Sequence, residues 1–236
     1  MKLLDGLYSY EVVSLVLGAV LFLVLLARLI KAGPSLSLLP FFAVSIVMIG
    51  FPSIKSVEFH NGIVKIEKTT HALEQDPAKA SLREALSQEV TRTAARPSSD
   101  PRVPTTLARA QIALGDDAGA EANLQKALRT DPQSVEALQL KKRIELTHNL
   151  ISLTSRVEQN PKDATAKTEL EKTVAEVTRY PIASPTTLTT VARAQVVMGD
   201  RKQALSTVEK ALTINPNLAP AKQVKTQIKT MMLPPK

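Results

Sequence analysis

The sequence predicts a mainly α-helical protein with two N-terminal transmembrane helices, a short β-hairpin, and an α-solenoid made of a tandem 84-residue duplication. Three observations lead to this prediction. Two apolar runs occupy residues 12–30 and 36–54, and an Asn-Gly pair separates two short alternating segments at 57–66. Residues 74–144 align without a gap on residues 158–228, and about a third of the aligned positions are identical. A long internal period is typical of stacked helical repeats, which present surfaces for binding.

The composition limits the chemistry that the chain can perform. It contains no Cys and no Trp, and its formal net charge is +8. Disulfides, zinc fingers, iron–sulfur clusters and thiol catalysis are therefore excluded. Basic residues dominate from Arg201 onward. This excess indicates either a solvated face or a surface for acidic proteins, lipid headgroups or nucleic acid.

The first region, residues 1–55, is predicted to be a transmembrane hairpin with helices at about 12–30 and 36–54. Each apolar run has roughly 19 residues, enough to cross about 30 Å of hydrocarbon. A cleaved signal peptide is the alternative, but the first run is long and lacks a clear cleavage site. Arg28 and Lys31 concentrate positive charge in the connector. We therefore expect a two-pass protein of a bacterial inner membrane, with the connector in the cytoplasm and the repeat region outside it.

The second region, residues 56–68, is predicted to be a juxtamembrane β-hairpin. Asn61-Gly62 suits a two-residue type I′ turn, because both positions need positive φ. This register places four apolar side chains on one face: Val57, Phe59, Val64 and Ile66. A lone hairpin is marginal in water, so this face must pack on the repeats, on a membrane surface or on another subunit. In the last case it would be an assembly element.

The duplication defines two repeat units, a first copy at residues 69–153 and a second copy at 154–236. Each copy is predicted to contain four helices, two of which begin at an Asp-Pro or Asn-Pro pair, with the acid or amide as N-cap and Pro as the first helical residue. These pairs are Asp76-Pro77, Asp131-Pro132, Asn160-Pro161 and Asn215-Pro216. Gly115-Asp116 and Gly199-Asp200 each separate two short helices, and the glycine is predicted to be a left-handed C-cap.

One helix pair in each copy resembles the tetratricopeptide repeat family. The residues that carry the resemblance are Leu107, Ala108, Gly115, Asp116, Ala120, Leu124, Ala127 and Pro132, with Val191, Ala192, Gly199, Asp200, Ala204, Val208, Ala211 and Pro216 in the second copy. The chain departs from the family at Gln111 and Gln195, where Tyr is usual. Its 84-residue period is also not a multiple of the family's usual length. The resemblance implies a divergent solenoid that binds proteins.

In such a family, the first helix of each pair lines a concave groove. The resemblance places six residues there: Thr105, Arg109, Ile112, Thr189, Arg193 and Val196. The two arginines occupy the same position in both copies. Guanidinium groups along a groove would bind the carboxylates of an acidic or C-terminal peptide. The alternative is that each Arg pairs with nearby acids of its own chain.

The sequence shows no catalytic, cofactor-binding or metal-binding constellation. The three histidines, His60, His71 and His148, have no metal-ligand spacing, and no phosphate-binding loop or nucleophile elbow occurs. The basic C-terminal segment lacks aromatic residues for base stacking, so nucleic acid is not an expected partner. We expect a membrane-anchored scaffold or adaptor that binds protein partners, not an enzyme. The alternative is a structural subunit of a homo-oligomeric membrane assembly.

Overall fold

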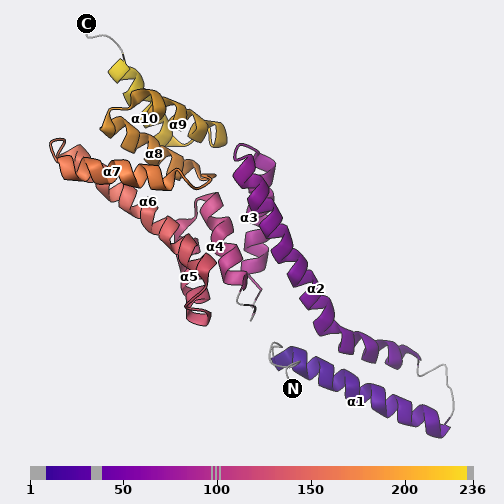
Figure 1. The fold of residues 1–236 in the computed structure, drawn as a ribbon. Helices are drawn as coiled ribbons and strands as arrows, with labels where there is room; N and C mark the ends of the chain where they lie inside the picture. Colours follow the sequence, from indigo (N-terminus) through magenta and orange to yellow (C-terminus); the bar gives the residue numbers. More distant parts are fainter. Residues whose placement is uncertain (1–8, 33–38, 97, 99, 101, 233–236) are drawn as a thin grey trace. The chain divides into compact units, whose positions relative to one another are not determined.

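The computed structural model describes residues 9–32, 39–96, 98, 100 and 102–232. The chain divides into two compact units, with the boundary between Val64 and Lys65. Figure 1 shows a helical chain, in which α1 (Ser9–Ala32) is followed by the long helix α2 (Leu39–Gln75). Since α2 crosses the boundary, its first part belongs to the N-terminal unit and its last part to the repeat unit.

In the N-terminal unit, α1 and the first part of α2 pack closely. A Cβ atom added at Gly18 would lie 2.9 Å from the Cβ atom of Met48, so the approach of the two helices requires glycine. The rings of Phe22 and Phe42 meet edge to face, with centroids 5.6 Å apart. The buried Ser45 hydroxyl donates to the carbonyl of Phe42 at 2.8 Å. Small and aromatic side chains thus set this helix contact.

The predicted transmembrane hairpin is wrong. Among the residues that the structure describes, none of the helices combines the length and the apolar character needed to cross a bilayer. The second predicted span does not end near residue 54, because α2 continues through Lys65, Glu67 and Lys68 to Gln75. This finding also contradicts the expected two-pass topology and the expected location in a bacterial inner membrane.

The predicted β-hairpin at 56–68 is also wrong, since this whole segment lies inside α2 and the described residues contain no strand. Alternating apolar residues at 57–66 favoured a strand, but a helical spacing runs through the same segment. Ile63, Ile66, Thr70 and Leu73 are all buried and recur every three or four residues. Burial of this helical stripe outweighs the low helix propensity of glycine in the Asn-Gly pair.

The repeat unit continues from α2 with two successive sets of helices, whose bounds recur along the chain. They are α3 (Ala80–Ala94), α4 (Arg102–Leu114), α5 (Asp117–Thr130), α6 (Val135–Gln159), α7 (Ala164–Val177), α8 (Pro185–Met198), α9 (Arg201–Ile214) and α10 (Ala219–Met232). Adding 84 to the first residues of α3, α5 and α6 gives 164, 201 and 219, where α7, α9 and α10 begin. The ends of α2 and α6, at residues 75 and 159, are also 84 apart.

The Asp-Pro and Asn-Pro pairs form turns and do not begin helices, which corrects the prediction. Asp131, Asn160 and Asn215 are C-caps of the preceding helices. At all four pairs, the amide three residues further on donates to the carbonyl of the acid or amide residue at 3.1–3.3 Å. Pro stands at the second position of this turn, where its fixed φ is also favourable. The next helix begins about three residues later than predicted.

The glycine C-caps are confirmed. Gly115 and Gly199 have φ values of 88° and 89°, which a side chain would disfavour. The following aspartates, Asp116 and Asp200, cap the N-termini of α5 and α9 by accepting the amides of Gly119 and Gln203. The chain therefore makes the same tight helix-to-helix connection in both copies.

Equivalent residues form the cores of the two copies. In the first copy the core contains Ala108, Ala120, Leu124, Ala127, Ala137, Leu140 and Ile144. In the second copy it contains Ala192, Ala204, Val208, Ala211, Ala221, Val224 and Ile228. Alanine at the crossing points lets helices approach closely, and the larger side chains fill the remaining space. A third cluster of α6, α7 and α8 residues joins one copy to the next.

Candidate functional site

The two arginines expected in the groove each bind a glutamate of their own chain. Arg193 donates two hydrogen bonds to Glu158, at 3.0 Å and 2.7 Å. In the first copy Arg109 donates to Glu74 at 3.0 Å. In each pair the arginine and the glutamate are 35 residues apart in the chain, so the duplication preserves the interaction itself. These contacts support the alternative that each Arg pairs with an acid of its own chain.

The surroundings of the two pairs differ. The side chain of Glu74 is only 6 % exposed and also lies 3.9 Å from Arg143, whereas Glu158 is 32 % exposed. In addition, Arg109 lies 4.0 Å from Glu136. The second copy has uncharged residues at both corresponding positions, Gln227 for Arg143 and Pro220 for Glu136. In the first copy, ion pairs therefore connect α6 to Arg109 and Glu74. The second copy lacks the charged residues for the equivalent ion pairs between α10, Arg193 and Glu158.

At that surface the second copy has an open groove of about 570 Å³. It is lined by residues of α8, of α10 with the turn before it, and of the end of α6: Glu158, Thr186, Thr189, Thr190, Arg193, Leu218, Pro220, Gln223, Val224 and Gln227. Leu218 and Pro220 supply apolar surface, whereas the exposed Gln223 and Gln227 offer both donors and acceptors. This combination suits a peptide backbone, whose amides and carbonyls alternate.

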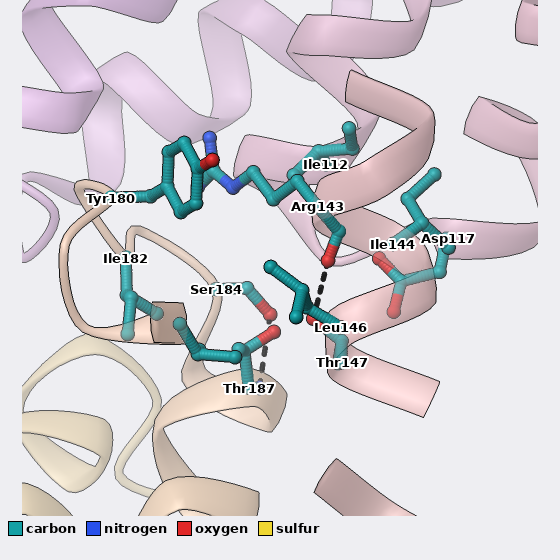
Figure 2. Close-up of a pocket in the computed structure, with 11 residues that line it drawn as sticks. Ile112, Asp117, Arg143, Ile144, Leu146, Thr147, Tyr180, Ile182, Ser184 and Thr187 are labelled. Atoms are coloured by element: carbon teal, nitrogen blue, oxygen red, sulfur yellow. Dashed lines mark hydrogen bonds between the residues drawn. The ribbon is translucent and has the colours of Figure 1, made fainter. Parts of the chain in front are cut away.

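A second, enclosed space of about 10 Å³ lies where the two copies meet, between α5 and α6 on one side and the segment before α8 on the other (Figure 2). The guanidinium of Arg143 lies 5.8 Å from the centre of the Tyr180 ring and donates to the carbonyl of Pro181. Arg83 donates to the carbonyls of Leu114 at 3.3 Å and Ala183 at 2.6 Å. Two arginines of the first copy thus hold the backbone of the second.

Burial at this junction changes the charge equilibria. It lowers the pKa of Arg143, although the nearby Glu74 carboxylate opposes the shift. Desolvation raises the pKa of Asp117, which lines the same space, and the neighbouring His148 opposes that shift. Both shifts follow from removing charged groups from water.

The structure brings together only part of the predicted groove. Thr189 and Arg193 line the open groove, although Thr189 is buried and its hydroxyl donates to the carbonyl of Pro185 at 2.7 Å. Thr105 and Ile112 are buried, with Ile112 at the junction space, and Val196 packs on the core of the second copy. The predicted assembly residues Val57, Phe59, Val64 and Ile66 lie along α2 and form no hairpin face.

Sequence reasoning missed the glutamates and glutamines of this site. The Glu-Gln pair at 74–75 recurs at 158–159, so the duplication already contained the signal for a shared partner of the arginines. The groove itself depends on positions where the copies differ, Pro220 and Gln227, and identity between copies could not reveal it.

Within the described part of the chain, no three His, Asp or Glu side chains come together as a metal site would require. Comparison with known proteins gave no match, whether to protein family models, to curated protein sequences or to solved structures.

Proposed function

We propose that this chain is a protein-binding scaffold of the tetratricopeptide type, and that its second copy binds an extended peptide in the open groove. One observation carries the proposal: a groove of about 570 Å³ occupies the place where the first copy has ion pairs. A duplicated chain that keeps the charged contacts in one copy and replaces them in the other has separated two roles. The first copy contributes stability and the second offers a surface.

The groove chemistry favours an extended, largely uncharged segment. Arg193 is already engaged by both oxygens of Glu158, so a partner carboxylate would have to displace that ion pair. The two exposed glutamines can instead pair with peptide amides and carbonyls, while the apolar surface of Leu218 and Pro220 accepts one hydrophobic side chain. Peptide recognition of this kind needs no cofactor and no catalytic residue.

The experiment is selection of peptides from a displayed random library on the purified chain and on a closed variant. The closed variant carries Pro220→Glu and Gln227→Arg, which restore the first copy's residues and its ion pairs. Peptides selected on the parent should lose at least tenfold in affinity on the closed variant, about 1.4 kcal/mol. Circular dichroism should show the same helix content in both proteins.

Gln223 provides a matched control, because Gln139 is the same residue at the same place in the first copy. Gln223→Ala should weaken the selected peptides, whereas Gln139→Ala should not. If the library yields no peptide, or if the selected peptides bind the closed variant as well as the parent, the groove does not have this function.

A further inference from the structure

The junction between the copies shows how this chain holds an extended segment. Tyr180-Pro181-Ile182-Ala183-Ser184 runs without helix between α7 and α8 and lies against the first copy. Its backbone is held by donors of the first copy, Arg143 to the carbonyl of Pro181 and Arg83 to that of Ala183. At the end of this segment, a Cβ atom added at Gly115 would lie 2.9 Å from the Ser184 hydroxyl oxygen. The first copy therefore binds a proline-containing segment mainly through its carbonyls.

The second copy presents the equivalent face uncovered. A Cβ atom added at Gly199, the counterpart of Gly115, would meet no atom of the described residues within 4 Å. Met231, the counterpart of the buried Thr147, is 40 % exposed. Gln227, the counterpart of Arg143, is exposed as well. The duplication has thus reproduced the receiving face, and in the described chain no segment covers it.

The charges on the uncovered face differ from those on the covered one. Arg201 replaces Asp117, and Lys167 replaces Arg83. Lys202 adjoins Arg201, and both are exposed. The Arg201 side chain donates to the carbonyl of Met231 at 2.8 Å, and within the described chain it forms no ion pair. Among the described residues, neither Lys167 nor Lys202 forms an ion pair.

We propose that this uncovered face, formed by Lys167, Gly199, Arg201, Gln227 and Met231, binds an extended, proline-containing acidic segment of a partner protein. The segment would lie as residues 180–184 lie on the first copy. Its carbonyls would accept hydrogen bonds from Lys167 and Gln227, and an acidic side chain in the place of Ser184 would face Arg201. Of the five residues of this face, Gln227 also lines the groove, and the other four do not.

The chain supplies its own probe for this proposal. A labelled peptide with the sequence of residues 178–187 copies the segment that the first copy already holds, and a Ser184→Asp form of it adds the acidic side chain. Fluorescence anisotropy with the full chain should show saturable binding at one site per chain. The acidic peptide should bind about tenfold tighter than the unchanged peptide at low salt, and this advantage should shrink at high salt.

Two variants of the full chain test the assignment by giving the face the first copy's residues. Arg201→Asp should abolish the preference for the acidic peptide, and Asp is favourable at that helix start. Lys167→Arg should tighten both peptides, because the planar guanidinium matches Arg83. Gln223→Ala, in the groove only, should change neither peptide. A lack of saturable binding, or an unchanged preference in Arg201→Asp, would overturn the proposal whether or not the groove binds its own peptides.

Discussion

Arg193 binds Glu158 through two hydrogen bonds, and Arg109 binds Glu74 at the equivalent place in the first copy. The duplication therefore preserved an ion pair that links α4 to the end of α2 and α8 to the end of α6. The same pair occurs in two environments, since Glu74 is covered and Glu158 borders an open groove. Because equivalent residues occur in both copies, a substitution in one copy can be compared with the same substitution in the other.

The glutamates should contribute unequally to stability. Glu74→Gln removes the buried carboxylate that pairs with the half-exposed Arg109 and the largely buried Arg143, and we expect a loss of about 3 kcal/mol in the free energy of unfolding. Glu158→Gln breaks a more exposed pair and should cost about 1 kcal/mol or less. Urea unfolding followed by circular dichroism measures both. Equal losses would show that the difference in burial is without energetic effect.

Substitution of the glycine C-cap should also destabilise the first copy more than the second. Alanine at Gly115 or Gly199 forces a side chain into positive φ, at a cost of about 1–2 kcal/mol. Gly115→Ala must in addition displace the Ser184 hydroxyl, which lies 2.9 Å from the added Cβ atom, whereas the space at Gly199 is open. Gly115→Ala should therefore lower the midpoint of thermal unfolding further than Gly199→Ala. The reverse order would contradict the close contact at the junction.

One buried polar atom should allow a stabilising substitution. Within the described chain, the side-chain oxygen of Gln195 has no hydrogen-bond partner, whereas that of Gln111 accepts from Asn123 at 2.7 Å. The second copy has Thr207 in place of Asn123. Thr207→Asn should supply the missing donor and raise the free energy of unfolding by about 1 kcal/mol.

The reciprocal change is the control for that prediction. Asn123→Thr should leave the oxygen of Gln111 without its donor and lower the free energy of unfolding by about 1–3 kcal/mol. If Thr207→Asn has no effect while Asn123→Thr destabilises, the space around Gln195 does not admit the amide.

The N-cap of α7 should make stability depend on pH. The backbone amide of Ala166, followed by the Arg156 side chain, holds the pKa of Asp163 below its usual range. Because the folded-state pKa is depressed, this contribution is complete above the unfolded value of about 3.9 and disappears as the pH falls through the folded value. Asp163→Ser keeps a cap without the charge. Stability measured between pH 6 and pH 2 should fall more steeply in the parent, and parallel curves would refute the assignment.

The repeated part of this fold could be predicted from the sequence more accurately than the first third of the chain. Identical glycines and alanines at an 84-residue spacing predict the tight connections at Gly115 and Gly199 and the close helix crossings. These features depend on local steric limits, which residue type reveals directly. The Asp-Pro pairs were misread by about three residues, because proline suits both a first helical turn and the second position of a β-turn.

The N-terminal region was misread because two periodicities coincide there. Apolar residues at 57–66 alternate as in a strand, yet Ile63, Ile66 and Leu73 follow a helical spacing whose extent beyond residue 66 decides the outcome. Only the arginines of the candidate site could be predicted from the sequence, for a different reason. The arginines could be identified in both copies. Their ion pairs with Glu74 and Glu158 depend on the packing of helices whose paired residues are 35 positions apart in the chain.

The most direct test of the account is cross-linking of a groove-selected peptide to a photoreactive benzophenone side chain placed at Gln223 or at Gln139. The two positions are equivalent in the two copies, and only Gln223 lines the open groove. We predict efficient cross-linking from position 223, little from 139, and loss of the 223 product when Pro220→Glu and Gln227→Arg close the groove. Equal yields from both positions, or a 223 product that survives closure, would contradict the claim that the second copy is the binding copy.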